Sequence, residues 1–592
     1  NLRVASAMDH EIEGPDDMYI EGEAGDDVGR LTVTASVAPG QKLRVLKFLS
    51  YGWSGRRSLS SVRAQVRGSL SEARHTGWNG LLKAQRAFLD DFWDNADIVV
   101  EGDPELQQAV RFGLFHLMQA SARGERRAIP AKGLTGSGYD GHAFWDTETF
   151  VLPVLTYTLP EAARDALHWR HATLDLARER AAQLGLAGAA FPWRTIAGRE
   201  CSGYWPASTA AFHVSADVAD AVYRYFRATG DKVFYREVGV PVLVETARLW
   251  TSLGRHDARG EFRIAGVTGP DEYSAITDNN VYTNLMAARN LRAAAEVVEL
   301  FPDAAEELEV GPNEPSHWIH AADSMHVPYD EGQQVHPQAD NFTHHERWPF
   351  DHMSAADYPL LLHYPYFDLY RKQVVKQADL VLALYTNGDY FTQEEKRRNF
   401  EYYEGITVRD SSLSACTQAI VAAETGYLDL AFAYLEETVY VDLHNLAHNT
   451  SDGLHLAASA GGWLGLVAGF GGFRDYSDRP AFAPRLPKQI DRLTFKLRIQ
   501  GSTLMVDVAR DEATYSLVHG EELKIRHHGE DILVDGDGPV TLPIAAIEEL
   551  PAPTQPKGRA PGELRPPEPQ FDETGALREV EGPYAHQSGG AV

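Results

Sequence analysis

The chain has 592 residues, and 55 lysines and arginines against 84 aspartates and glutamates give it a formal net charge of −29. Such a length predicts several domains, and 44% hydrophobic with 23% charged residues indicates a folded globular protein. The negative charge argues against nucleic acid or an anionic membrane surface as a partner, because both would repel the protein.

The two cysteines, Cys201 and Cys416, are too few for a disulfide framework, which favours a reducing cytoplasm. No run of about 18 apolar residues predicts a membrane span, and the first residues do not read as a secretory signal. We therefore expect a cytoplasmic protein.

Residues 1–75 alternate short β-type runs with turns, most clearly Leu31–Val37 and Leu43–Leu49. So few strands do not readily form a stable sheet alone, so we predict a partial N-terminal β-sandwich. Because Asn1 starts shortly before strand-like sequence, we expect a preceding segment of the same protein.

Residues 76–100 are assigned to a helical linker and 101–472 to a helical catalytic domain. Asp103 followed by Pro104 is a favourable helix start, with a capping carboxylate and then proline in the first turn. A second amphipathic helix follows Asn279 or Asn280. Further helices are predicted over residues 160–185, 213–229, 238–253, 369–386 and 411–424.

The period returns to two near the C-terminus, where Leu493, Phe495, Leu497 and Ile499 alternate with polar residues. Residues 473–549 are therefore predicted to form a small antiparallel β-domain. Residues 550–592 are rich in Pro, Gly and Glu, and we expect them to be disordered or draped on the surface.

A loop with the sequence GPDEY at 269–273 precedes a predicted helix. Its Glu272 can act as a general acid if burial raises the carboxyl pKa. A plain turn with an acidic helix cap explains the same residues.

Aromatic and acidic residues recur together in a way that suits a sugar. Trp145 precedes Asp146, so an indole face and a hydrogen-bond acceptor lie side by side, although a core aromatic beside a helix cap is an equal reading. Trp193 and the YWP at 204–206 repeat the theme, which favours a carbohydrate pocket.

Arg409, Ser411 and Ser412 open a predicted helix, where hydroxyls and free backbone N–H groups favour an anion. An ordinary Ser/Asp cap is the commoner meaning. Lys376 lies on a predicted helix among apolar residues and needs an anionic or polar partner if it is buried. His455, in a second small-residue loop, reads as structural when taken alone.

Other chemistries lack their motifs. The sequence has no Walker loop, no dinucleotide-type GxGxxG and no CxxC or HExxH, so no metal and no cofactor are expected. The Gly-X-Ser-X-Gly elbow of esterases is also missing.

The chain resembles glycoside hydrolase family 65, the inverting disaccharide phosphorylases that act on trehalose, kojibiose, nigerose or maltose. The resemblance covers about residues 100–549, and it implies a mainly α fold with flanking β: an (α/α)6 barrel after a β-sandwich and before a small C-terminal β-sandwich. The matching segments are FWDTE at 144–148, FPWRTIAGREC at 191–201, GVTGPDEY at 266–273, KQAD at 376–379, VRDSSLS at 408–414 and DGLHLAASAGGW at 452–463.

This resemblance implies that Glu272 protonates the glycosidic oxygen while inorganic phosphate, the co-substrate, attacks C1, so that no protein base is required. Many family members carry His where this chain has Arg409, and Arg can grip phosphate equally well. The residues implied or favoured to hold the sugar are Trp145, Asp146, Trp193, Lys376 and Gln377, and those for phosphate are Arg409, Ser411, Ser412 and His455.

The resulting prediction is phosphorolysis of an α-glucosyl disaccharide to β-glucose 1-phosphate and glucose, with trehalose as first choice because FPWRTIAGREC is followed by YWP. Homodimers are what the family implies. Hydrolysis by a trehalase-like or kojibiose hydrolase-like route, with Asp410 as the acid in the phosphate loop, is the first alternative. A non-catalytic carbohydrate-binding protein is the second.

Overall fold

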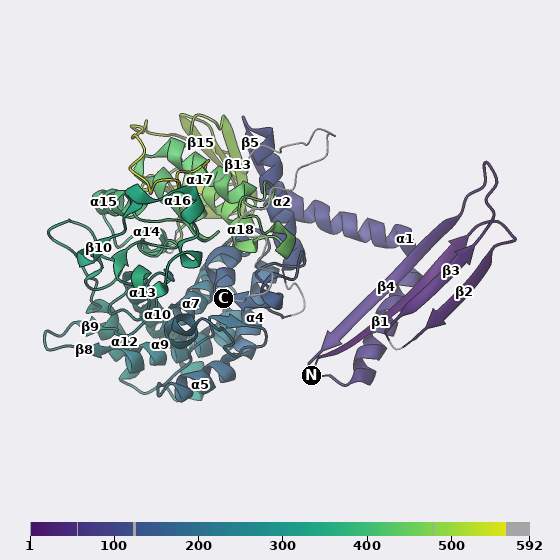
Figure 1. Cartoon of the computed structure of the whole chain (residues 1–592), viewed down its shortest axis with the longest axis horizontal. Helices are drawn as coiled ribbons and strands as arrows, with labels where there is room; N and C mark the ends of the chain where they lie inside the picture. Colours follow the sequence, from purple (N-terminus) through teal and green to yellow (C-terminus); the bar gives the residue numbers. More distant parts are fainter. Residues whose placement is uncertain (1, 26, 56, 122–125, 478, 564–592) are drawn as a thin grey trace. The chain divides into compact units, whose positions relative to one another are not determined.

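The computed structural model describes residues 2–25, 27–55, 57–121, 126–477 and 479–563. The chain divides into two compact units, Asn1–Asp94 and Asn95–Val592, which are described separately (Figure 1). Within the described residues, no helix has both the length and the apolar character that crossing a bilayer requires.

The N-terminal unit consists of two antiparallel strand pairs and a helix. The first strand pairs with the fourth along its whole length, and the second pairs with the third. The helix begins well before residue 76, where the linker was predicted, and breaks at Gly77, whose φ of 67° favours glycine. The elements are β1 (Arg3–Glu13), β2 (Tyr19–Ala24), β3 (Gly29–Thr34), β4 (Arg44–Ser54) and α1 (Leu59–Ala96).

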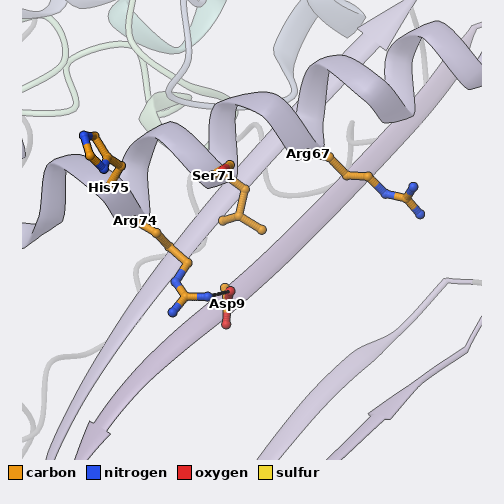
Figure 2. Close-up of a pocket in the computed structure, with 6 residues that line it drawn as sticks. Asp9, Arg67, Ser71, Arg74 and His75 are labelled. Carbon is orange, nitrogen blue, oxygen red and sulfur yellow. Dashed lines mark hydrogen bonds and ion pairs between the residues drawn. The ribbon is translucent and has the colours of Figure 1, made fainter.

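Helix α1 packs closely on the β1–β4 pair because β4 carries a glycine at the contact. A Cβ on Gly52 would lie 2.8 Å from Val66 Cγ2, and both Val62 and Val66 are buried. Further along α1, Arg74 forms an ion pair of 2.7 Å with Asp9 of β1 (Figure 2). A small pocket surrounds this pair, lined also by Arg67, Leu70, Ser71 and His75.

The second unit is mostly helical. Its longer helices are α2 (Pro104–Ala120), α4 (Pro160–Ala172), α5 (Leu174–Gln183), α7 (His213–Thr229), α9 (Val240–Leu253), α10 (Val281–Leu300), α12 (Glu314–Asp323), α15 (Gln393–Glu404), α16 (Ser414–Thr425), α17 (Leu428–Tyr440) and α18 (Leu456–Leu464). Shorter ones are α3 (Leu152–Thr158), α6 (Trp205–Ala210), α8 (Lys232–Phe234), α11 (Pro302–Glu307), α13 (Tyr366–Leu369) and α14 (Leu380–Thr386).

Single turns of 3-10 or π type complete the helical part: η1 (Gly138–Gly141), η2 (Thr147–Val151), η3 (Tyr235–Gly239), η4 (Phe342–His344), η5 (Phe350–His352), η6 (Ala355–Asp357), η7 (Leu360–Leu362), η8 (Thr450–Asp452) and η9 (Gly465–Phe470). The two predicted caps are confirmed. Asp103 accepts hydrogen bonds from Glu105 N and Leu106 N, and Asn280 accepts one from Thr283 N.

One predicted helix is wrong. Within residues 370–386 a helix, α14, begins only at Leu380, and Lys376 and Gln377 lie at bends outside any helix or strand. The backbone of this stretch bonds to other segments instead of to itself: Val375 N donates to Ile406 O, and Val408 N donates to Val375 O. Its apolar side chains are therefore buried without helical periodicity.

The C-terminal part contains a five-stranded and a three-stranded sheet. The larger has the order β18-β15-β14-β13-β5, so its edge strand β5 (Ile98–Glu101) comes from before the helical region (Figure 1). The smaller has the order β12-β16-β17. The strands are β12 (Ala481–Phe482), β13 (Arg492–Ile499), β14 (Ser502–Val508), β15 (Glu512–His519), β16 (Glu522–His527), β17 (Glu530–Asp535) and β18 (Val540–Pro543).

Very short strand pairs link loops within the helical part. They are β6 (Ala143–Phe144) with β7 (Arg194–Thr195), β8 (Arg255–His256) with β9 (Phe262–Arg263), and β10 (Glu346–Arg347) with β11 (Lys372–Gln373). After β18 the chain returns to the helices, where residues 550–563 make specific contacts. Residues 564–592 of the predicted tail lie outside the described residues.

Candidate active site

Glu272 stands in the loop between β9 and α10, and buried polar groups fix that loop. The carboxylate of Asp271 accepts hydrogen bonds from Tyr273 N (3.1 Å), Lys376 N (2.8 Å) and Gln338 Nε2 (2.9 Å). Asp271 N in turn donates to Asp379 Oδ2 at 3.1 Å. The predicted segments GPDEY and KQAD are thus joined by hydrogen bonds from backbone N–H groups of each to an aspartate side chain of the other.

The two aspartates that hold this loop are buried. Burial raises the pKa of Asp271 to about 6. Burial, together with the charge of Asp271, raises the pKa of Asp379 to about 7. The two carboxyl groups that hold the loop in place, those of Asp271 and Asp379, are therefore expected to change their protonation state near neutral pH.

Glu272 and Lys376 meet directly. Lys376 Nζ lies 2.9 Å from Glu272 Oε2, and the side chains are 13% and 16% exposed, so both are mostly buried but keep some contact with solvent. Burial lowers the pKa of Lys376, but the charge and hydrogen bond of Glu272 outweigh that effect and raise it. The non-helical segment between Gln373 and Asp379 brings Lys376 to this position.

Asp146 belongs to the same cluster. Burial first, and then the charge of Glu272, raises the pKa of Asp146 to about 7, whereas the charge of Lys132 opposes the increase. Strand β6 just before Asp146 pairs with β7, with Ala143 opposite Thr195. This pairing is why two segments far apart in the sequence, 144–148 and 191–201, lie together.

The predicted sugar platform Trp145 is a core residue. Its side chain is 2% exposed and packs edge-on against His213, Phe150 and Tyr282, with ring centroids 4.9, 5.9 and 6.4 Å away. The expectation that a sugar ring stacks on this indole is not supported, because its side chain is almost fully enclosed, and the alternative reading of a core aromatic fits. Its role in holding the glucose stays a prediction.

Tyrosines line the loop of Glu272 instead. Tyr204 Oη donates to the Glu272 carbonyl at 2.8 Å and lies 3.1 Å from Tyr370 Oη. Tyr366 packs against both rings, with centroids 5.6 and 5.5 Å away. Trp193 is partly buried, packs against the cluster that contains Tyr204, and meets Phe144 edge-on at 5.2 Å.

The amide of Gln377 is committed to the loop. Its Nε2 donates to the Pro270 carbonyl at 2.5 Å, and the side chain is buried. The structure thus gives Gln377 a part in placing Glu272, which follows Pro270 by two residues. The predicted contact with glucose is untested.

Ser411 and Ser412 precede α16 and are half-buried. Ser411 Oγ accepts a hydrogen bond from Leu413 N at 3.3 Å. The first N–H groups of a helix have no partners within it, so this turn can donate to an anion. Helix α18, which starts after His455, packs tightly on α16 because a Cβ on Gly461 would lie only 2.7 Å from Cys416 Cβ.

His455 is held in a buried polar triad. Its Nδ1 lies 2.7 Å from Asp442 Oδ1, and its Nε2 lies 2.9 Å from Lys132 Nζ. Since a carboxylate only accepts and an ammonium only donates, Nδ1 donates to Asp442 and Nε2 accepts from Lys132. Burial lowers the pKa of Lys132, and the charges of Asp442, Asp452 and Asp146 act against that decrease.

Arg409 has different partners from those predicted. Its Nε donates to Glu437 Oε1 at 3.0 Å, its Nη1 to Tyr434 Oη at 3.3 Å, and its Nη2 to the carbonyl of Arg559. The side chain is buried and its charge is matched by Glu437. These contacts do not support the predicted role of Arg409 in binding phosphate.

Several residues of this region escape sequence reasoning. Lys132 stands in a loop without any motif, and Asp442 follows the end of α17 as a lone acid. Tyr204 was part of the noted YWP, which was the one available signal. Arg559 comes from the segment expected to be disordered or draped on the surface, where composition gives no hint of burial.

Comparison with known proteins agrees with this geometry. Residues 111–464 match the glycosyl hydrolase family 65 central catalytic domain, residues 473–534 its C-terminal domain and residues 1–92 its N-terminal domain. A solved structure from the human microbiome, named as a candidate kojibiose phosphorylase, superposes with a TM-score of 0.83 at 26% identity, over 91% of this chain and 72% of its own. The predicted fold class, an (α/α)6 barrel with flanking β-domains, is confirmed.

Two other proteins are similar to this chain in amino-acid sequence over most of its length. An uncharacterized glycosyl hydrolase of Mycobacterium tuberculosis is 55% identical over 95% of this chain and 71% of its own length. The α,α-trehalose phosphorylase of Thermoanaerobacter brockii is 39% identical over 90% of this chain and 70% of its own length. With the central catalytic domain matched over most of the helical unit, this chain belongs to glycosyl hydrolase family 65.

Proposed function

We propose that this chain catalyses the phosphorolysis of an α-glucosyl disaccharide with inversion, and that α,α-trehalose is the first substrate to test. The observation that carries the proposal is the meeting of Glu272 and Lys376 at 2.9 Å beside the tyrosines, in a loop fixed from behind by Asp271. The relationship to a trehalose phosphorylase supports the choice of substrate.

In the proposed reaction Glu272 gives its proton to the glycosidic oxygen, which takes the electron pair of the breaking C1–O bond and leaves on glucose. An oxygen of inorganic phosphate forms the new bond to C1 from the opposite face, so the product is β-glucose 1-phosphate. Lys376 and Asp146 supply a donor and an acceptor for the hydroxyls of the transferred glucose. Phosphate is received by the turn at Ser411 and Ser412 together with the Lys132–His455 pair.

The state of Asp410 favours phosphate over water as the nucleophile. An inverting hydrolase needs a carboxylate free to take a proton from water. Asp410 Oδ2 already accepts from Tyr273 Oη at 2.7 Å and from Leu360 N at 2.8 Å, and its Oδ1 faces Arg559 Nη2 at 3.3 Å. Oδ2 is thus occupied by two donors, and Oδ1, which accepts no hydrogen bond among the described residues, is ion-paired with Arg559, so Asp410 is tied to this loop instead of being held free for a water molecule.

The test is to incubate the full chain with α,α-trehalose, kojibiose, nigerose or maltose, each with and without inorganic phosphate. Phosphorus and proton NMR would identify the sugar phosphate and its anomer. We expect β-glucose 1-phosphate from trehalose only when phosphate is present. Free glucose made equally well without phosphate would instead indicate hydrolysis, and no turnover of any of the four sugars would favour a binding protein.

A further inference from the structure

The segment from Leu550 to Glu563 attaches to three parts of the helical domain. Leu550 N donates to Gly426 O at 3.1 Å, beyond the end of α16. Gln555 Nε2 donates to Tyr434 Oη of α17 at 2.8 Å, and Tyr358 Oη donates to the Lys557 carbonyl at 3.1 Å. We call residues 550–563 the C-terminal strap.

The strap buries one arginine against the loop that precedes Ser411. Arg559 is 6% exposed, and its guanidinium donates to the carbonyls of Val408 and, at 2.6 Å, of Arg409. It also lies 3.3 Å from Asp410 Oδ1 and 4.9 Å from the centroid of the Tyr358 ring. A buried guanidinium is tolerated only with such partners, and here they include three consecutive residues, 408–410.

Arg409 and Arg559 hold each other reciprocally, since each guanidinium donates to the other's carbonyl. Arg409 has a φ of 55°, a left-handed conformation that a residue with a side chain seldom adopts. Such a conformation persists when surrounding contacts enforce it. The strap supplies some of those contacts, so it helps to set the path of the chain into Ser411 and Ser412.

Asp410 connects this loop to the general acid. Through Oδ2 it binds the hydroxyl of Tyr273, the residue after Glu272, and its side chain is almost completely buried. Burial raises the pKa of Asp410, and the charge of Arg559 is the largest influence against that increase. Without Arg559, a carboxyl group next to the anion-binding turn would lose its counter-charge.

We propose that Arg559 is a positioning residue for phosphate. Through Asp410 and the carbonyls of residues 408 and 409, the C-terminal strap orients the Ser411–Ser412 turn and offsets the negative charge of Asp410 next to it. This inference rests on the proposed function. Arg559 contacts the loop, and the loop contacts the phosphate.

The experiment compares wild type with Arg559→Ala and Arg559→Lys, at saturating trehalose with varied phosphate and then the reverse. For Arg559→Ala we expect the KM for phosphate to rise by about tenfold or more, because Asp410 is left unpaired beside the anion. The KM for trehalose should change much less. Arg559→Lys keeps the charge and should recover part of the loss, and adding Asp410→Asn to Arg559→Ala should also lower the KM for phosphate.

Lys557→Ala is the matched control, since it removes an exposed cation from the same strap and leaves the carbonyl that Tyr358 binds. Phosphate-induced stabilisation against heat gives a readout without turnover: inorganic phosphate should raise the Tm of wild type more than that of Arg559→Ala. If Arg559→Ala does not fold, the comparison is made with Arg559→Lys.

An unchanged KM for phosphate in a folded Arg559→Ala, or equal changes in both KM values, would overturn the proposal. The wild-type protein is assayed first. If it yields no glucose 1-phosphate, the proposed function is refuted, and this result is distinct from a failure of the proposal for Arg559.

Discussion

The proposed site has an acid half around Glu272 and an anion half around Ser411 and Ser412, and the charged residues of the two halves are paired differently. In the acid half, Glu272 and Lys376 pair with each other, and both side chains remain partly exposed. In the anion half, Arg409 is paired inward with Glu437 and Arg559 with Asp410. The proposed phosphate site therefore consists of a helix start and the Lys132–His455 pair. The comparison teaches that an arginine beside an anion-binding motif can serve the loop and not the ligand.

The largest effect is expected from the acid half. Glu272→Gln keeps the size of the side chain but cannot donate the required proton, so kcat should fall by about 10²–10⁴-fold while disaccharide binding persists. Steady-state rates and calorimetric titration with trehalose measure the two quantities. Glu299→Gln, an exposed residue in the last turn of α10, is the matched control. Turnover close to that of wild type would exclude Glu272 as the acid.

The next prediction concerns the anion half, where Lys132 is a cation of the proposed phosphate site. Lys132→Met should raise the KM for phosphate by about 10–100-fold, the range expected when one charge-assisted hydrogen bond is lost. Initial rates at varied phosphate check this.

Lys396→Met is the control, because Lys396 is also buried and ion-paired, at 2.6 Å from Glu424. It should lower stability and leave the KM for phosphate unchanged. If Lys132→Met also leaves the KM for phosphate unchanged and lowers only stability, Lys132 has a structural role and is not part of the phosphate site.

The smallest effect is expected for Asp379, which binds the backbone of the loop that carries Glu272. The folded pKa of Asp379, about 7, is above the ordinary value, so the stability it contributes is present at low pH and is lost as the pH rises through 7. Asn cannot ionise. The stability of Asp379→Asn relative to wild type should therefore improve by about 1–3 kcal/mol from pH 5 to pH 8.

Urea unfolding at the two pH values measures this difference. The control is Asp531→Asn, because Asp531 is exposed and its ion pairs with Arg526 and Arg479 lower its pKa. The difference in the free energy of unfolding between Asp531→Asn and wild type should be the same at pH 5 and pH 8. A flat difference for Asp379→Asn as well would show that Asp379 is already ionised at pH 5.

Local patterns predicted much of the fold. The helix over 213–229 and the caps at Asp103 and Asn280 follow from short-range spacing, and the C-terminal strands follow from strict alternation. The helix over 369–386 failed because the hydrogen bonds of Val375 and Val408 are long-range, and nothing local announces them. Strand β5 escaped for the same reason.

Two of the predicted motifs do come together, since Glu272 and Lys376 pair directly, and their roles toward a ligand stay predictions. It was not predictable where burial decides the role. Trp145 has the right type for stacking, yet its neighbours His213 and Tyr282 enclose it. Lys132 and Arg559 carry no local signal, because their partners, His455 and Asp410 respectively, lie more than a hundred residues away in the sequence.

The pairing of β5 with β13 has a consequence for how the protein is made. Residues 98–101 leave the ribosome before the helical barrel, and their sheet partner, Arg492–Phe495, follows only after it. Strand β5 therefore has no sheet partner while the barrel is synthesised. Bringing β5 and β13 together closes a loop that contains the whole barrel, which is an intrinsically slow step. We expect newly made chains to pass through a stage in which the barrel helices have formed but the sheet that brackets them is still open.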